Sequence, residues 1–360
     1  MWSKLWQKIN NTVAGGAILI AGFSFLSKIL GLLRERLIAY NFGASEISDI
    51  YYAAFRLPDL IFNTLVLGAL TSAFIPVFQK VWHKNKEEGL KLANSTLNFF
   101  LLVIGGLVII AWIFTPQIMQ ILTPGFSEWQ IIKVSQLTRV MLLAILFFVA
   151  SNVIGGILNS WKKFFSFSLA ASLYNVGIIV GIVWLYPIFG LVGLAWGVFL
   201  GAALHLLTQL PEVIKHGWHY QFSLEFTKPL KRILLLMLPR TFGLAAGQIN
   251  LIVITIVAST LSAGSIAIFN LANNLQSLPI SLFAVSLAIA VFPTFTQAVG
   301  NEDNETFARH FSASFRRILF LLVPLSIFIL LLRAQIVRII LGTGAFDWSN
   351  TYYVAQTLGF

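Results

Sequence analysis

Apolar runs long enough to cross a lipid bilayer recur along this chain of 360 residues. A bilayer core requires a run of about 20 apolar residues when the segment is helical. Only 10% of the residues are charged, whereas soluble domains carry about 25%, so too few are present to coat a surface in water. The runs are continuous rather than alternating, which excludes a membrane β-barrel. We therefore predict an all-α fold, a polytopic transmembrane helical bundle.

The runs predict nine membrane spans and the beginning of a tenth. Several exceed 25 residues, so these helices must tilt, bend or project beyond the bilayer. The expected bends are at Gly31, Pro58, Gly68 and Pro279. The predicted spans are 12–40, 47–79, 92–114, 131–158, 164–186, 188–210, 230–260, 264–298 and 310–332, with the tenth starting near residue 350.

Lysine and arginine gather at alternate ends of these spans, which predicts the orientation. If the N-terminus is cytoplasmic, the cytoplasmic segments hold most of the 24 basic residues, as the positive-inside rule requires. Arg333 and Arg338 fall on the outer side, against the trend. The basic residues of the cytoplasmic segments form a collar that faces anionic lipid. The collar accounts for the net charge of +11, so the charge does not imply a nucleic acid as a partner. The collar consists of Lys4, Lys8, Lys80, Lys84, Lys86, Lys91, Lys162, Lys163, Lys215, Lys228, Lys231, Arg232, Arg309, Arg316 and Arg317.

The sequence offers little for catalysis or for a cofactor. It has no cysteine, no glycine-rich phosphate loop, no carboxylate dyad and no nucleophile elbow. His216 and His219 have a spacing that suits a metal but lack a third ligand, so a solvated loop is favoured. Asp49 and Asp59 lack the Asp-x-Asp spacing of a metal-dependent glycosyltransferase. We therefore predict that the protein is not an enzyme and that it needs neither a metal nor an organic cofactor.

An internal echo predicts two lobes. "LPDLIFNTLVLGALTSAFIPVFQ" (57–79) resembles "LPISLFAVSLAIAVFPTFTQ" (278–297), and the two lie in spans 2 and 8. An offset of six spans preserves orientation, so the repeat is parallel about an axis along the membrane normal. The predicted N-terminal lobe is residues 1–211 with spans 1–6. The C-terminal lobe, residues 212–360, is incomplete and holds spans 7–9 and the start of span 10.

Charged residues inside the first span form one polar stripe. In "SKILGLLRER" (27–36), helical spacing puts Ser27, Lys28, Arg34 and Glu35 along one side. A charge at the centre of a membrane helix costs about 2.5–3.5 kcal/mol on insertion scales. The stripe must therefore face a water-filled cavity or another helix.

Three further spans carry polar residues at similar depth, and together they predict a central cationic cavity for an anionic substrate. Two structural alternatives stay open at this stage: ion pairs such as Lys28–Glu35 or Arg56–Asp59, and asparagine side chains that join helices by hydrogen bonds. The residues concerned are Asp49, Tyr52, Arg56, Asp59 and Asn63 in span 2, Arg240 in span 7, and Asn270, Asn273, Asn274 and Ser277 in span 8.

Six stretches carry a resemblance to a known family: the segment from "SKILGLLRER" to "AAFRLPDLIF" (27–62), "GALTSAFIPVF" (68–78), "TPGF" (123–126), "GGILNSWKKF" (155–164), "QLP" (209–211) and "ASTLSAGSIAIFNLANNL" (258–275). They resemble the MurJ/MviN family, the lipid II flippases of the MOP exporter superfamily. The resemblance implies two six-helix lobes around a cationic cavity, two extra helices that form a lipid-tail groove, and a place in the bacterial cytoplasmic (inner) membrane. Since the family has fourteen spans, we expect this chain to be a fragment or a truncated gene product.

The resemblance also assigns individual positions. Ser27, Arg34 and Asp49 match family residues, Lys28 stands where the family usually has arginine, and Glu35 replaces an aspartate. Two cavity arginines of the family have no counterpart, because their positions fall at Phe62–Asn63 and at Asn274; Arg56 and Arg240 are expected to compensate. The predicted substrate-binding residues are Ser27, Lys28, Arg34, Glu35, Asp49, Arg56, Arg240, Asn270 and Asn274.

The leading hypothesis is a flippase that moves lipid II to the outer leaflet by alternating access, with bending at Pro58 and Pro279. The alternative is an exporter of another undecaprenyl-linked oligosaccharide of the same superfamily. A polyprenyl-phosphate enzyme would need carboxylate or histidine clusters, and a purely structural protein would not need unbalanced cations at depth. Expected partners are lipid II or a related undecaprenyl-pyrophosphate glycan and membrane lipids, and the protein is expected to be a monomer.

Overall fold

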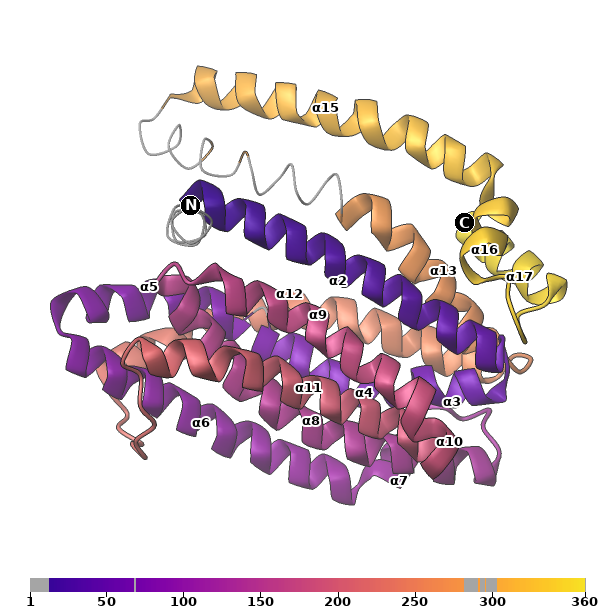
Figure 1. The fold of residues 1–360 in the computed structure, drawn as a ribbon, viewed down its shortest axis with the longest axis horizontal. Coiled ribbons are helices and arrows are strands. Elements are labelled where there is room, and N and C mark those ends of the chain that lie inside the picture. Colours follow the sequence, from indigo (N-terminus) through magenta and orange to yellow (C-terminus); the bar gives the residue numbers. More distant parts are fainter. Residues whose placement is uncertain (1–12, 68, 282–290, 292–294, 296–302, 360) are drawn as a thin grey trace, which may run out of the picture. The chain divides into compact units, whose positions relative to one another are not determined.

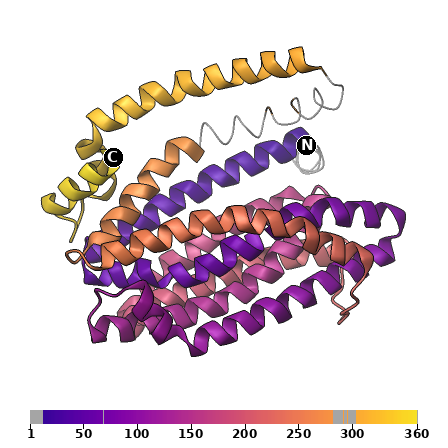
Figure 2. The ribbon, with the colours of Figure 1, turned by 180° about the vertical axis from the view of Figure 1, so that it is seen from behind.

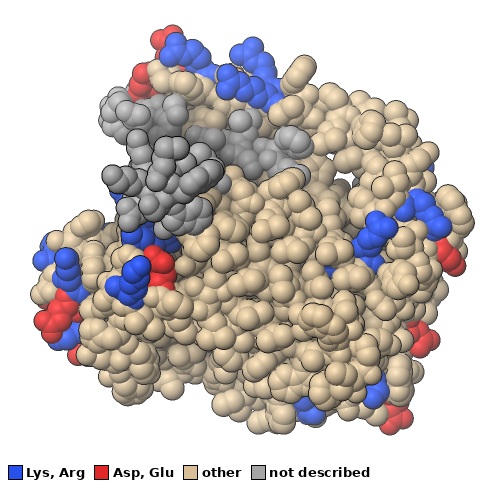
Figure 3. All heavy atoms as spheres, in the orientation of Figure 1, with Lys and Arg blue, Asp and Glu red and all other residues tan. Residues whose placement is uncertain are grey.

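The structure is a computed structural model that describes residues 13–67, 69–281, 291, 295 and 303–359. Within these residues every regular element is a helix, which confirms the all-α prediction (Figure 1). Figure 3 shows a broad tan face between groups of charged side chains, as a membrane-spanning bundle requires. Six described stretches are long and apolar enough to cross a membrane: 86–113, 128–160, 164–189, 191–215, 228–259 and 305–331.

The helices follow the predicted spans closely, except in the second and eighth. The remainder of the predicted eighth span, beyond the end of α13, lies almost entirely outside the described residues, as does Gly68. In chain order they are α2 (Val13–Phe42), α3 (Glu46–Ala54), α4 (Arg56–Ile61), the π-helical η1 (Phe62–Leu67), α5 (Ala69–Lys84), α6 (Lys86–Ile113), α7 (Thr115–Leu122), α8 (Glu128–Ser160), α9 (Phe164–Val180), the π-helical η2 (Gly181–Leu185), α10 (Tyr186–Phe189), α11 (Leu191–Lys215), α12 (Lys228–Ser259), α13 (Ser265–Pro279), α15 (Asn304–Leu331), α16 (Arg333–Leu341) and α17 (Trp348–Gly359).

The chain divides into two compact units. The first comprises residues 1–37 and 46–263, and the second comprises 38–45 and 264–360. Helix α12 packs on α5 and belongs to the first unit, although the repeat places it at the start of the second lobe. The units reflect packing and the lobes reflect the repeat, so the lobe boundary between residues 211 and 212 remains a prediction.

Glycine lets two helices of the first unit approach each other closely. Figures 1 and 2 both show α9 and the antiparallel α11 side by side. A Cβ atom on Gly177 would collide with the backbone of Gly201, and one on Gly181 would collide with Gly197. Membrane helices often associate through small residues four positions apart, because the close approach provides the packing that lipid cannot. This contact fixes α9, whose opposite side carries part of the candidate site.

The second predicted span is not one helix. It is interrupted at Phe55, three residues before the expected bend at Pro58, and it continues as α4, η1 and α5. Proline has no N–H, so the carbonyl of Ala54 loses its helical partner. The buried hydroxyl of Thr138 in α8 donates to that carbonyl over 3.2 Å. The break is thus stabilised by a neighbouring helix, and it sets the direction in which α4 presents its charged residues. Gly31, also an expected bend, lies within the uninterrupted α2.

The linker from α11 to α12 is fastened along α6 (Figures 1 and 2). Asn94 Nδ2 donates to the carbonyl of His219 over 3.1 Å, and Asn98 Nδ2 donates to that of Ser223 over 2.9 Å. The Tyr220 hydroxyl returns a hydrogen bond to Asn98 Oδ1 over 2.9 Å. These contacts hold the linker that leads into α12 along α6.

In the second unit, the turn between α16 and α17 meets the end of α2. The N–H of Ala345 donates to the carbonyl of Tyr40 over 2.9 Å. Arg338 donates to the carbonyl of Phe346 over 3.2 Å, and its guanidinium lies 4.7 Å from the ring centre of Trp348. Arg333 Nη1 donates to the carbonyl of Leu330 over 2.8 Å. The two arginines that depart from the charge trend therefore have local structural contacts.

Candidate functional site

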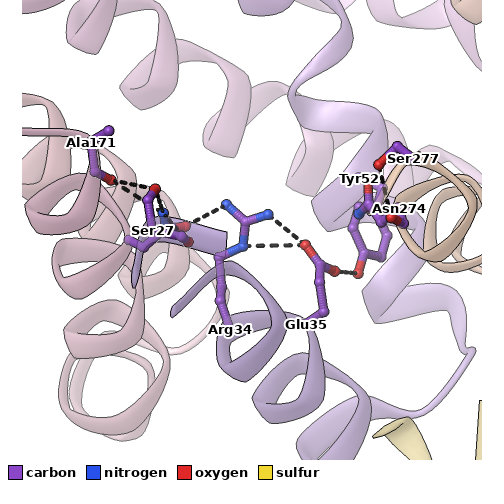
Figure 4. Close-up of polar contacts among 8 residues, drawn as sticks. Ser27, Arg34, Glu35, Tyr52, Ala171, Asn274 and Ser277 are labelled. Atoms are coloured by element: carbon purple, nitrogen blue, oxygen red, sulfur yellow. Dashed lines mark hydrogen bonds and ion pairs between the residues drawn. The ribbon is translucent and has the colours of Figure 1, made fainter. Parts of the chain in front are cut away.

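An ion pair between adjacent residues of α2 lies at the centre of the candidate site (Figure 4). Arg34 Nε donates to Glu35 Oε1 over 3.2 Å, and Nη2 donates to the same oxygen. The Arg34 side chain is 23% exposed and that of Glu35 is 6% exposed. The carboxylate is therefore enclosed while the guanidinium keeps an open side. An ion pair within α2 was one of the structural alternatives. Glu35 does form such a pair, but with Arg34 rather than with Lys28.

Asn175 of α9 joins Arg34 to Ser27. Its Oδ1 accepts from Arg34 Nη1 over 3.3 Å, and its Nδ2 donates to Ser27 Oγ over 3.1 Å. Ser27 Oγ in turn donates to the carbonyl of Ala171 over 3.2 Å. The two ends of the amide have opposite roles, so the hydrogen bonds fix its orientation. Sequence reasoning missed Asn175, although an amide side chain inside an apolar span is a signal of function.

Tyr52 of α3 completes the shell around the carboxylate. Its hydroxyl donates to Glu35 Oε2, so both carboxylate oxygens of Glu35 are occupied. A guanidinium has five N–H donors, and Arg34 uses three of its own on Glu35 and Asn175. Two N–H groups of Arg34 remain available to a ligand among the described contacts. Arg34 and Glu35 together carry no net charge, and their contacts hold the Arg34 guanidinium in an orientation that can bind an anion.

Arg56 occupies a different position, between α4 and α12. Its Nε donates to Thr255 Oγ1 over 2.7 Å, and that hydroxyl donates to the carbonyl of Leu251 over 2.9 Å. Arg56 is buried, with 6% exposure. Thr255 was also missed, since a single threonine in an apolar helix carries no distinctive pattern. This contact joins the interrupted span to α12.

Arg240 and Lys28 lie away from these contacts. Arg240 precedes Thr255 on α12 by 15 residues, which is about 22 Å along a helix. Lys28 precedes Glu35 by seven residues, about 10 Å along α2. Both side chains are exposed, and neither has an ion-pair partner among the described residues. The structure therefore spreads the predicted cations over different depths instead of gathering them at one point.

The remaining predicted residues are distributed over α3 and the second unit. Asp49 is buried on α3, with 4% exposure. Asn270 Nδ2 donates to the carbonyl of Ile266 over 2.6 Å, and the carbonyl of Asn274 accepts from Ser277 Oγ over 2.8 Å. Of the nine predicted residues, the described contacts join Ser27, Arg34 and Glu35.

The described membrane-spanning helices enclose an arginine, an amide and a carboxylate, and such groups in membrane helices usually mark the pathway of a substrate or an ion. The fold is that of the MOP superfamily. It matches the solved "Inward-facing conformation of a multidrug resistance MATE family transporter of the MOP superfamily" with a TM-score of 0.78, covering 95% of this chain and 79% of that chain. At 18% sequence identity this likeness concerns the fold alone.

The family model for lipid II flippase MurJ matches residues 38–360, and the chain belongs to this family. It is similar to a solved structure of "Lipid II flippase MurJ, inward closed conformation", with a TM-score of 0.81, 30% identity and coverage of 95% of this chain and 71% of that chain. A probable lipid II flippase MurJ of Buchnera aphidicola subsp. Schizaphis graminum is 33% identical over 90% of this chain and 64% of its own length. Lipid II flippase MurJ of Burkholderia cenocepacia is 29% identical over 94% of this chain and 68% of its own. The chain thus spans about two thirds of the length of these relatives.

Proposed function

We propose that this protein moves lipid II, the lipid-linked precursor of peptidoglycan, from the inner to the outer leaflet of the bacterial cytoplasmic membrane. Membership of the MurJ family supports lipid II as the substrate. The single observation that carries the proposal is the guanidinium of Arg34, held at membrane depth by Glu35 and Asn175 with two N–H groups left for a ligand. A pair of N–H groups on one guanidinium suits the oxygens of a pyrophosphate, to which arginine binds in a bidentate manner.

Each residue has a distinct part in this proposal. Glu35 offsets the charge of Arg34 while no substrate is bound, and Asn175 and Ser27 fix the orientation of the guanidinium. Lys28, about two turns nearer the N-terminus of α2, provides a second cation for the same headgroup. The proposed further contacts are Asp49, Arg56, Arg240, Asn270 and Asn274.

Transport needs no covalent step and no cofactor. The two lobes would alternate between states open to either side, and the substrate would shift the population between them through differential affinity. In this proposal the N-terminus is cytoplasmic, the monomer is the working unit, and bending occurs at Pro58 and Pro279.

A second candidate keeps the mechanism and changes the cargo to another undecaprenyl-pyrophosphate-linked oligosaccharide. It is favoured by the uncharged residues Asn63 and Asn274 at positions where the resemblance leads one to expect arginine. Both cargoes share the pyrophosphate that Arg34 would bind, so they differ in the sugar and peptide portion alone.

The test is binding and leaflet transfer by the full-length protein in lipid nanodiscs and proteoliposomes. Arg34→Gln should weaken binding of lipid II by tenfold or more and should slow its transfer. Arg139→Gln is the matched control, because among the described residues the polar contacts of Arg139 are with Trp112, through a hydrogen bond of 3.1 Å and the ring face. A normal affinity in Arg34→Gln would refute the proposed site. Binding of an undecaprenyl-pyrophosphate glycan without the peptide in preference to lipid II would favour the second candidate.

A further inference from the structure

A second polar cluster lies between α8 and α11, away from Arg34. Ser151 Oγ lies 2.5 Å from His205 Nδ1, and Gln209 Nε2 donates to Ser151 Oγ over 2.7 Å. His205 is 14 residues from the start of α11 and ten from its end, so it lies about 15–21 Å from each end. An ionisable side chain at such a depth in a membrane protein usually serves a function.

Ser151 can serve His205 in either protonation state. The amide nitrogen of Gln209 can only donate, so Ser151 Oγ is the acceptor there. The serine oxygen also has a second lone pair and its own hydrogen, so it can donate to a neutral Nδ1 or accept from a protonated one.

One acceptor in the cluster is left over. Gln209 is fully buried, and its Oε1 has no hydrogen-bond partner among the described residues. A Cβ added to Gly155 would lie 3.0 Å from this oxygen, so the glycine leaves room beside it. A buried acceptor without a donor costs about 1–3 kcal/mol, and Gln209 bears this cost because its amide nitrogen is held by Ser151 and by the carbonyl of His205.

Adding one proton to His205 Nδ1 reverses its hydrogen bond with Ser151. The charged ring donates to Ser151 Oγ, which has two lone pairs and continues to accept from Gln209 Nε2. The serine hydroxyl turns to the carbonyl of His205, 3.5 Å away. One proton is bound, no covalent bond breaks, and each of these three donors has an acceptor.

The surroundings hold no competing charge among the described contacts. On α8, Phe148 meets the His205 ring edge to face with centroids 5.5 Å apart, and on α9 the titratable Tyr174 packs against Phe148 instead. Arg139 of α8 lies 12 residues before Ser151, about 18 Å along the helix. Tyr186 of α10 lies near Gly193 at the other end of α11.

We propose that His205 is a proton-binding site within the membrane, and that Ser151, held in place by Gln209, is the reversible hydrogen-bond partner that accommodates the proton. Phe148 also contacts Phe62 of η1, with ring centroids 4.8 Å apart. Phe148 therefore links His205 to the interrupted second span. Through this link, proton binding would change the conformation of that span. This proposal does not depend on the identity of the cargo.

The test is nuclear magnetic resonance of the full chain, with its five histidines labelled with ¹⁵N, in nanodiscs between pH 8 and pH 4. The signal lost in His205→Gln identifies the residue. We expect a neutral ring at pH 8 and reversible protonation as the pH falls. Ser151→Ala removes the acceptor of the protonated ring, so proton affinity should fall about tenfold, which lowers the titration midpoint by about one pH unit.

Two controls keep the result interpretable. Thr208→Val alters a hydroxyl that donates within its own helix, to Leu204, and should leave the midpoint unchanged. If Ser151→Ala does not fold, Ser151→Cys provides the same comparison, because a thiol is a weak hydrogen-bond acceptor. The proposal is overturned if His205 takes up no proton in this range, if removing the Ser151 hydroxyl leaves its midpoint unchanged, or if sodium at constant pH changes the signal as the proton does.

Discussion

The hydroxyl of Thr138 donates a hydrogen bond to the carbonyl of Ala54, which is the carbonyl that Pro58 cannot serve. The two residues are 84 positions apart in sequence and belong to α8 and α3. Their contact explains why the second span can change direction inside the membrane without an unsatisfied backbone group. It also fixes the position from which Arg56 reaches Thr255.

Replacing Thr138 by valine should destabilise the protein by about 1–3 kcal/mol, because the buried Ala54 carbonyl would lose its donor while the side-chain shape is kept. The measurement is thermal or denaturant unfolding in detergent. Thr208→Val is the control, since Thr208 bonds only to a carbonyl of its own helix. Equal effects of the two substitutions would show that the contact across helices contributes nothing specific.

Asn175→Leu should reduce the affinity for an undecaprenyl-pyrophosphate lipid about tenfold. The substitution removes the acceptor that orients Arg34, which corresponds to about 1.4 kcal/mol. Binding to the purified protein in nanodiscs is the measurement. Asn159→Leu is the matched control, because Asn159 is a partly buried asparagine with no described side-chain hydrogen bond. An unchanged affinity in Asn175→Leu would show that Asn175 does not contribute to binding at the site.

Gly197→Leu should prevent the close approach of α9 and α11. A Cβ on Gly197 would collide with the backbone of Gly181, which no rotamer change relieves. We expect a loss of more than about 2 kcal/mol, within the range of overpacked cores, seen as a lower unfolding temperature. Gly106→Ala should be neutral or slightly stabilising, because nothing lies within 4 Å of its added Cβ and alanine favours helices.

Asp303 lies outside the membrane-spanning segments and makes the stability of the start of α15 depend on pH. Hydrogen bonds from the side chain and the N–H of Thr306 lower the pKa of Asp303 below its ordinary value of 3.8. A lowered pKa means that the cap stabilises α15 above that ordinary value and is lost as the pH falls through the folded-state pKa. Hydrogen-exchange protection of the Thr306 amide should therefore decrease in acid. Asp303→Asn keeps the cap and should abolish this pH dependence; a persistent dependence would point to another group.

The sequence alone determined the class of fold. Runs such as 131–158 and 230–260 require helices in a bilayer because backbone groups must be satisfied within the segment, and α8 and α12 follow them within a few residues. The polar stripe of Ser27, Arg34 and Glu35 could also be predicted from the sequence, because helical periodicity depends on nothing outside the helix. The motifs were sufficient to indicate the family.

Tertiary structure decided the partners. Glu35 pairs with Arg34 and not with Lys28, because Asn175 holds Arg34 and Tyr52 holds Glu35, each from another helix. The second span breaks at Phe55 because Thr138 is there to take the Ala54 carbonyl. Gln209 and His205 of α11 meet Ser151 because α8 packs against α11. Such contacts depend on which helices meet and in what register, and one-dimensional periodicity does not encode distances between residues far apart in the chain.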